Sequence, residues 1–281
     1  MESGKIKQRS EIIKKIILYI TLSVIAVFMA IPFLWMLSTS LKDPAAVFRY
    51  PPQWIPKPIV FKNYIDAWKA VPFARFFLNS IIVAVCVTIG QVFTSSLAAY
   101  AFARLQFPGR DKIFLCYLAT MMIPGQVTMI PVFILCRKLN LIDTYYALIL
   151  PGMFSAYGTF MLRQFFLTIP KELEEAAIID GLNRWQIYWK IILPLSKPAL
   201  ATLATFVFLG SWNDFMWPLI VTNSMEMKTL PVGLAAFQGL YASDWTLLMA
   251  ASTIVIAPVL IIYVFNQRFI TRGIVMTGLK G

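Results

Sequence analysis

The stretch "ELEEAAIIDGLNRWQIYWKIILP", residues 172–194, differs in chemistry from the rest of the 281-residue chain. Only 14% of the chain is charged, yet four carboxylates fall within nine positions here. They are Glu172, Glu174, Glu175 and Asp180. Because charged groups are costly in an apolar environment, this cluster indicates a segment that meets water or a polar partner.

Local signals predict a short helix, a glycine turn and a second helix. Pro170 suits the first helical position, where its missing N–H costs no hydrogen bond. The glutamates then fall in the first turns, where they complement the positive end of the helix dipole. Ala176 and Ala177 favour helix and keep its surface slim. Gly181 is expected to end this helix in the left-handed conformation, and Asn183 to cap the next one.

The second helix is expected to carry one broad apolar face and to end at Pro194, before the next span. Its large side chains recur at i, i+3, i+4 and i+7, at Trp185, Tyr188, Trp189 and Ile192. The prediction is a helix–Gly–helix elbow with an acidic tip towards the cytosol and aromatic side chains towards the bilayer. The alternative is an amphipathic pair lying on the membrane surface. Such anchors are rich in Lys and Arg, so the acidic tip favours docking of a soluble partner.

The composition excludes several classes of protein. Hydrophobic residues make up 59% of the chain and the mean hydropathy is +0.73, whereas soluble domains are about 45–50% apolar. The absence of histidine excludes Ser-His and Cys-His nucleophile pairs and histidine-ligated metals. Cys86, Cys116 and Cys136 lie in apolar runs and are expected to be buried. The net charge of +12 comes mainly from basic residues beside apolar runs, which indicates contact with membrane lipid and not with nucleic acid.

Hydropathy predicts an all-α integral membrane protein with six transmembrane helices. A helix needs about 20 apolar residues to cross a bilayer. The stretches near this length are Ile16–Leu37, Phe76–Ala103, Ile113–Cys136, Thr144–Leu162, Pro198–Val221 and Trp245–Gln267. Asp214 interrupts the fifth of them. Prolines such as Pro124, Pro131 and Pro151 are tolerated where neighbouring helices satisfy the freed backbone groups.

Basic residues predict a cytoplasmic N-terminus and C-terminus. In this orientation 16 of the 25 Lys and Arg residues lie inside, although the first outer loop alone carries six. The first apolar run is 22 residues long without an obvious cleavage site, which favours a retained helix over a signal peptide. The expected division is a cytoplasmic N-terminus at 1–15, a first transmembrane helix at 16–37, an extracytoplasmic loop at 38–75, a transmembrane core at 76–270 containing the elbow at 170–194, and a cytoplasmic tail at 271–281.

The elbow has a recognisable spacing: E-A-A, three residues, G, nine residues, then I-x-L-P. This pattern resembles the cytoplasmic signature of permease subunits of binding-protein-dependent ATP-binding-cassette importers. The resemblance continues through "STSLKDP", "NSIIVAV", "AAYAFARLQFPGRD", "MMIPGQVTMIPVF", "FLGSWNDFMWPLIVT" and "VMTGLKG". The chain is similar to the shorter inner-membrane subunit of carbohydrate importers, related to the maltose permease's second subunit. It departs mildly at Ile179, where the family often has arginine, and in the tail "IVMTGLKG", where "LTAGAVKG" is commoner.

The resemblance implies a type I importer transmembrane domain whose elbow docks into a cleft of an ATPase. The implied coupling residues are Glu174, Glu175, Ala176, Ala177, Asp180 and Gly181. The implied partners are a second permease subunit in a heterodimer, two copies of a cytoplasmic ATPase and an extracytoplasmic sugar-binding protein, at a bacterial or archaeal cytoplasmic membrane. No Walker motif occurs, so we expect no catalytic residue, metal site or cofactor in this chain; ATP and Mg²⁺ would be bound by the ATPase.

A second group of residues, at the outer end of the fifth span, is the candidate substrate pathway. It comprises Trp212, Asn213, Asp214 and Trp217. An ionisable group costs about 2.5–3.5 kcal/mol at the centre of a membrane helix, so Asp214 is expected to face a cavity or a partner. Aromatic faces beside amide and carboxylate groups suit sugars; interfacial anchoring and local capping are the structural alternatives. The outer loop Thr222–Asp244 is expected either to face the sugar-binding protein or to serve as a passive linker.

Two other functional classes compete with an importer subunit. An ion-gradient-driven secondary transporter usually has embedded carboxylates or broken helices and often more spans, and Asp214 alone gives it little support. An integral membrane enzyme would need a reactive constellation, and neither histidine nor paired carboxylates supply one. Dependence on a cognate ATPase separates the importer from both alternatives.

Overall fold

The computed structural model describes the backbone of residues 2–240 and 244–278 and the side chains of residues 11–235 and 244–265. The regular secondary structure of the described residues is helical. Two compact units divide the chain: unit 1 comprises residues 1–70 and 237–254, and unit 2 comprises residues 71–236 and 255–281. The expected cytoplasmic tail at 271–281 lies outside the described side chains.

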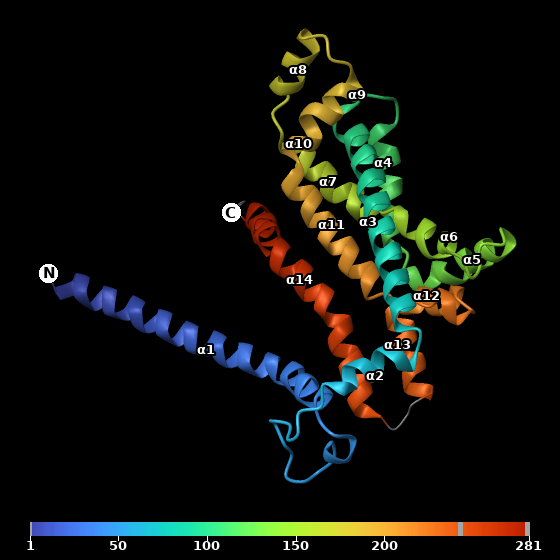
Figure 1. Cartoon of the computed structure of the whole chain (residues 1–281). Coiled ribbons are helices and arrows are strands. Elements are labelled where there is room, and N and C mark those ends of the chain that lie inside the picture. Colours follow the sequence, from blue (N-terminus) through green and yellow to red (C-terminus); the bar gives the residue numbers. More distant parts are fainter. Residues whose placement is uncertain (1, 241–243, 279–281) are drawn as a thin grey trace. The chain divides into compact units, whose positions relative to one another are not determined.

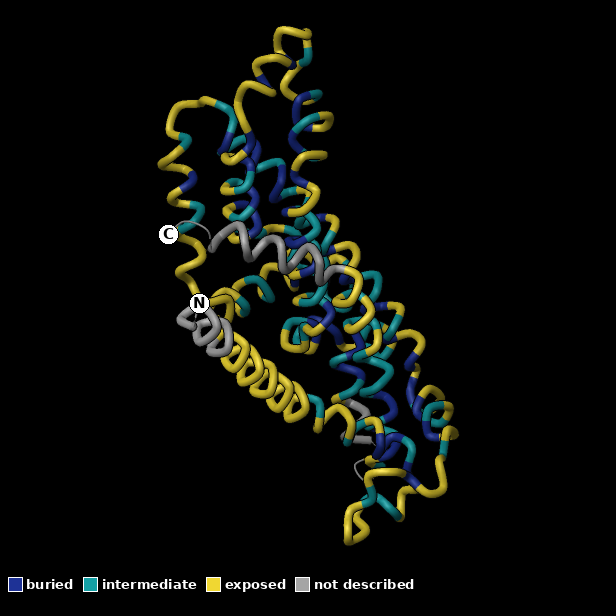
Figure 2. The backbone as a smooth tube through the Cα atoms, turned by 90° about the vertical axis from the view of Figure 1, so that its left-hand side faces the viewer, coloured by how far each residue is buried: buried dark blue, intermediate teal, exposed yellow. Residues whose placement is uncertain are grey.

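Unit 1 is dominated by α1 (Glu2–Ser40), followed by η1 (Pro44–Ala46) and α2 (Lys62–Ala70). Residues 11–40 of α1 are predominantly apolar and are exposed along nearly their whole length, as the yellow tube in Figure 2 shows. A helix that is apolar on every side and has no protein cover is expected to lie in lipid. The first expected span is therefore found as a single helix.

Within unit 1, polar and aromatic contacts hold the C-terminal end of α1 in place. The amide of Asn63 donates to the carbonyls of Ser40 and Lys42, at 2.9 and 2.8 Å. The Lys42 ammonium lies 3.8 Å from the ring centre of Trp35, which itself meets Trp54 edge-on at 5.2 Å. The "STSLKDP" stretch thus folds back onto α2 and the following loop.

Unit 2 is built along α3 (Phe73–Arg104), which packs against α7 (Ala156–Thr168) and α11 (Lys197–Trp212), as Figure 1 shows. Gly158 lets α7 approach closely, since a Cβ there would lie 2.7 Å from Ser95 Oγ. Buried apolar side chains from these three helices and from the elbow form one core. The elbow is therefore fastened to the same core that holds the long helices together.

Shorter elements complete unit 2. They are α4 (Arg110–Ala119), η2 (Thr120–Met122), α5 (Gly125–Lys138), α6 (Tyr145–Ile149), η3 (Leu150–Met153), α8 (Glu172–Ile179), α9 (Arg184–Ile187), the π-helix η4 (Tyr188–Ile192), α10 (Leu193–Leu195), α12 (Met216–Val221) and η5 (Met225–Met227). Two further helices, α13 (Leu230–Leu240) and α14 (Trp245–Gly278), contribute to both units.

The expected spans differ in how continuous they are. Among the described residues, three unbroken stretches are long and apolar enough to cross a membrane: Glu11–Ser40, Phe73–Arg104 and Trp245–Phe265. Two bent pairs raise the number of candidate spans to as many as five. Arg110–Met122 and Gly125–Lys138 meet at 98°, and Arg184–Leu195 and Lys197–Trp212 meet at 78°.

Three of the six expected stretches are not single helices, and one of them is Ile113–Cys136, which is divided into α4, η2 and α5. Thr144–Leu162 is divided into α6, η3 and the start of α7, because Pro151 follows α6 and Ser155 caps a new helix by accepting a 3.0 Å hydrogen bond from Gly158 N–H. Pro198–Val221 is interrupted after Trp212, and α12 begins at Met216. Proline and side-chain capping thus divide runs that hydropathy presents as continuous.

Two predictions on side-chain burial and helix ends were wrong. Cys86 and Cys116 are exposed, because they lie on outward faces of α3 and α4, and Cys136 alone of the three is buried. The helix after Asn183 does not stop at Pro194 but continues to Leu195. A π turn precedes this proline and replaces the regular α-helical hydrogen bonding with which proline is incompatible.

Candidate functional site

The elbow turns at Gly181, as its sequence predicts. Gly181 has φ +80°, a conformation that residues with a Cβ rarely adopt. Its N–H donates to the carbonyl of Ile178, and the N–H of Leu182 donates to the carbonyl of Ala177, at 3.0 and 2.9 Å. These two bonds form a Schellman motif, which ends α8 with its last carbonyls satisfied.

Asn183 starts the second helix through a reciprocal pair of hydrogen bonds. Its side-chain oxygen accepts from Gln186 N–H, and the Gln186 side chain accepts from Asn183 N–H, both at 2.9 Å. This capping box satisfies two helix N–H groups that would otherwise have no partner. The elbow is therefore a turn fixed at both ends by local hydrogen bonds, which confirms the predicted capping role of Asn183.

The six predicted coupling residues divide into two faces. Glu174 and Ala177 are buried against the rest of unit 2, whereas the other four are exposed. Ile179, which lies between Ala177 and Asp180 in the sequence, is also exposed, at 86%. We call the exposed set the docking tip; it consists of Glu175, Ala176, Ile179, Asp180 and Gly181.

The predicted aromatic face of the elbow is also divided. Tyr188 and Ile192 lie fully buried in the core, whereas Trp185 and Trp189 are exposed. The prediction that this face points to the bilayer is therefore wrong for Tyr188 and Ile192. The reason is that α3 packs against this side of the elbow, and the Tyr188 hydroxyl shares a 2.7 Å hydrogen bond with Ser96 Oγ.

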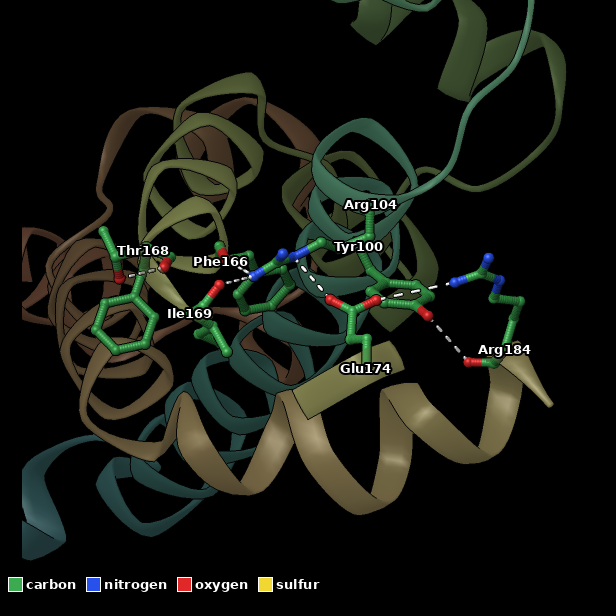
Figure 3. Close-up of polar contacts among 8 residues, drawn as sticks. Tyr100, Arg104, Phe166, Thr168, Ile169, Glu174 and Arg184 are labelled. Atoms are coloured by element: carbon green, nitrogen blue, oxygen red, sulfur yellow. Dashed lines mark hydrogen bonds and ion pairs between the residues drawn. The ribbon is translucent and has the colours of Figure 1, made fainter. Parts of the chain in front are cut away.

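Arg104, the last residue of α3, connects three segments at the base of the elbow (Figure 3). One Nη donates to the carbonyl of Phe166 and, at 2.6 Å, to that of Ile169, where α7 ends. Its Nε lies 2.9 Å from Glu174 Oε1, and the two side chains are only 3% and 7% exposed. This contact is an ion pair rather than a well-aligned hydrogen bond.

Two further residues extend this base. The Tyr100 hydroxyl donates to the carbonyl of Arg184 at 3.2 Å, and an Arg184 Nη lies 4.0 Å from Glu174 Oε2 (Figure 3). Burial raises the pKa of Glu174 above its ordinary value, against the lowering effects of Arg104, Arg184 and Lys171. The carboxylate therefore carries a desolvation cost that its cationic neighbours offset only in part.

Sequence reasoning did not identify Tyr100 and Arg104 as part of the site. Both stand in the quoted stretch "AAYAFARLQFPGRD", four residues apart at the end of an apolar helix. Polar residues at that spacing lie on one helix face, which is the signal that points to them.

A cavity of about 550 Å³ lies in unit 2, away from the elbow. Residues from α3, α5, α6, η3, α11 and α12 line it, among them Gln91, Gln126, Thr128, Asp214 and Trp217. Described residues lining it include no Lys or Arg. Amide, hydroxyl and carboxylate groups beside an indole can bind a polyhydroxylated solute by hydrogen bonding and stacking.

The four candidate pathway residues separate between the cavity and the core. Asp214 and Trp217 line the cavity, where Asp214 Oδ1 accepts from Trp217 N–H at 3.4 Å and Trp217 Nε1 donates to the Ala147 carbonyl at 2.9 Å. Trp212 is buried between Phe rings and donates to the Val255 carbonyl at 3.3 Å. Asn213 bonds back to the Leu209 carbonyl and does not line the cavity.

The outer loop Thr222–Asp244 begins as a fixed segment. Asn79 of α3 donates to the carbonyls of Glu226 and Lys228, at 2.7 and 2.9 Å. Asp143 Oδ1 accepts from the N–H groups of Asn223 and Ser224. The start of this loop is thus held on unit 2, and residues 241–243 lie outside the described part.

Comparison with known proteins gives consistent matches. The family described as "binding-protein-dependent transport system inner membrane component" matches residues 91–275. The arabinooligosaccharides transport system permease protein AraQ of Halalkalibacterium halodurans is 39% identical over 227 residues, which cover 80% of this chain and 81% of AraQ. The sn-glycerol-3-phosphate transport system permease protein UgpE of Yersinia pestis is 36% identical over 241 residues, covering 83% and 86%.

Solved structures agree with these relatives. A chain of a bacterial ABC transporter involved in import of the acidic polysaccharide alginate matches with a TM-score of 0.83 and 27% identity, covering 92% of this chain and 97% of that one. The matched family region contains the elbow, its Arg104 base and all the cavity-lining residues except Val87. The chain belongs to the family of inner-membrane components of binding-protein-dependent transport systems, and it is a multi-pass, non-catalytic permease subunit of an ATP-binding-cassette importer.

Proposed function

We propose that this chain is the sugar-importer permease that forms one half of a heterodimeric pore and couples ATPase closure to alternating access. Its partners are a second permease subunit, two copies of a cytoplasmic ATPase and an extracytoplasmic sugar-binding protein. ATP and Mg²⁺ are bound by the ATPase. Membership in a binding-protein-dependent family favours this function over ion-gradient-driven transport.

The observation that carries the proposal is the geometry of the elbow. The docking tip is exposed on a turn that a Schellman motif and a capping box hold in one conformation. A rigid, slim and acidic projection fits a groove on a soluble partner, since a preorganised element loses little conformational entropy on binding. The buried side of the same elbow is fastened to α3, so force applied at the tip reaches the spans.

The proposed topology has six crossings with both termini in the cytosol. Three unbroken helices and two bent pairs account for up to five crossings, and α6, η3 and α7 together supply the sixth. Broken helices are tolerated at membrane depth where protein or a cavity surrounds the break. The breaks near Pro124, Pro151 and Asn213 adjoin residues that line the cavity.

Two independent features support a sugar as the transported solute. AraQ belongs to an arabinooligosaccharide transport system and the matched structure is involved in alginate import, whereas UgpE belongs to a system for sn-glycerol-3-phosphate, a phosphorylated polyol. In addition, the cavity combines Gln91, Gln126 and Thr128 with the carboxylate of Asp214 and the indole of Trp217. We assign this cavity to the substrate pathway.

Affinity purification of the tagged chain in mild detergent tests the proposal. We expect an ATPase and a second permease to be recovered with it, and ATP hydrolysis in the complex to be stimulated by the sugar-loaded binding protein. Recovery of a lone chain that still transports solute would contradict an importer subunit.

A further inference from the structure

Three polar residues of α3 each contact a different part of the elbow. Ser96, Tyr100 and Arg104 follow one another at intervals of four, so they lie on one face of the helix. Ser96 bonds Tyr188 in the π-helix, Tyr100 bonds the Arg184 carbonyl, and Arg104 pairs with Glu174 of α8. We call these three residues the polar stripe of α3.

Arg104 has the most demanding position in the stripe. Its guanidinium holds two carbonyls at the end of α7 and a carboxylate at the start of α8, across the peptide link that enters the elbow. Without these contacts, the start of α8 would be held to α7 only by the short segment 169–171 and by the apolar packing of Ala177 in the core. Apolar packing is less directional than an ion pair, so α8 could then shift relative to the spans.

We propose that the polar stripe makes the elbow and α3 one rigid body, with Arg104 as the positioning residue that transmits displacement of the elbow to the spans. This inference rests on the proposed docking of the elbow on an ATPase. Arg104 does not touch that ATPase or any solute in this assignment. It acts by keeping Glu174, α7 and α3 in fixed relative positions.

The energetics of the buried ion pair indicate that Arg104 fixes the position of α8 and does more than fill space. Removing one partner of a buried ion pair leaves an uncompensated charge, which is far more costly than losing an exposed pair. Lysine cannot replace this arginine fully, because one ammonium lacks the planar fork that serves carbonyls and a carboxylate together. A residue whose only task was to fill space would not require this chemistry.

Distance measurement between spin labels tests the joint without knowledge of the transported solute. Labels are placed at Leu173 on α8, outside the docking tip, and at Ile89 on α3, both exposed, after Cys86, Cys116 and Cys136 have been replaced. The complex with the companion permease and ATPase is compared without nucleotide and after trapping with ATP, Mg²⁺ and vanadate. Loss of hydrolysis verifies the trapping.

We expect the native chain to keep one narrow distance distribution in both states. In Arg104→Gln the trapped state should show a shifted or second distance population. Arg104→Lys should restore the native distribution only in part. Glu172→Gln removes an exposed carboxylate from α8 outside the polar stripe; it is the matched control for Glu174→Gln and should behave as native.

Glu174→Gln and Tyr100→Phe keep the test decisive if Arg104→Gln does not fold, because each removes one contact of the stripe. Unchanged distances in these variants, with the ATPase still bound and trapped, would overturn the joint. Failure of the native chain to recover an ATPase would instead overturn the proposed function on which the joint rests.

Discussion

The elbow and the cavity are both built on α3, but they are constructed in different ways. The elbow is one contiguous segment whose turn and caps come from Gly181, Asn183 and Gln186, residues close together in sequence. The cavity takes its lining from six separate elements, several of which end beside it. The comparison teaches that the docking surface is encoded locally, whereas the solute pathway depends on how broken helices assemble.

The two regions also differ in how tightly their glycines are packed. Gly158, where α7 meets α3, has no room for a Cβ, since Ser95 Oγ would lie 2.7 Å away. Gly125 and Gly210, which line the cavity, have nothing within 4 Å of such an atom, whereas a Cβ at Gly152, also in the lining, would lie 3.0 Å from Val87. The elbow side is close-packed and transmits displacement, while the cavity side leaves space for a solute and for movement.

The largest effect is expected at Gly181. Gly181→Val should abolish recovery of the ATPase and ATP-driven transport, because a β-branched residue is strongly disfavoured at φ +80°. A Cβ there meets open space, so the penalty is conformational, about 1–2 kcal/mol even for an ordinary residue. Gly181→Asn, which tolerates this conformation, is the control and should retain the ATPase. Equal recovery with both variants would break the assignment of the turn.

Asp214 tests the cavity side of the comparison. Asp214→Asn should lower uptake of a sugar that the native chain transports by about tenfold, since a lost charged hydrogen bond is worth about 1.5–3 kcal/mol. Recovery of the ATPase should not change, because the elbow is unaltered. Asn213→Ala, beside it but outside the cavity lining, is the control. Loss of the ATPase in Asp214→Asn would show that the two regions are not separable.

Gly158 and Gly125 form a matched pair for packing. Gly158→Ala should destabilise the folded chain by about 1–3 kcal/mol through overpacking against Ser95. Gly125→Ala should leave stability nearly unchanged, as its Cβ has space. Thermal unfolding in detergent measures both. Similar melting temperatures would contradict the contrast between close-packed and open regions.

The smallest effect concerns pH. Because burial raises the pKa of Glu174 when folded, the folded chain binds this proton more tightly than the unfolded chain. Stability should therefore fall as pH rises from the ordinary value of 4.5 through the raised folded value, and level off above it. Glu174→Gln should remove this slope. A pH profile of melting temperature that is the same in both chains would contradict a desolvated carboxyl at this position.

Local chemistry explains which features the sequence predicts well. The Gly181 turn and Asn183 cap depend on hydrogen bonds within a few residues, and α1 and α3 follow from long apolar runs. Contacts between distant segments are different. Arg104 meets Glu174 across 70 positions, and the burial of Tyr188 depends on α3, so neither follows from spacing within the elbow.

The residues around the cavity show the same limit of prediction from sequence. Asp214 is conspicuous as a charge in an apolar run, and the structure places it in the cavity as expected. Trp212, two residues earlier, resembles it in sequence context but packs into the core, because its indole fits between Phe77 and Phe208. Helix rotation about a break decides between these outcomes, and periodicity does not fix it.

Site-specific photo-cross-linking compares the two regions most directly. A photoreactive residue is placed at Ile179 in the docking tip or at Met122, which is 84% exposed in η2, close to the break before α5. In the native complex, we expect Ile179 to cross-link to the ATPase and Met122 not to do so. Cross-linking of the ATPase from Met122, with none from Ile179, would contradict the elbow as its docking surface.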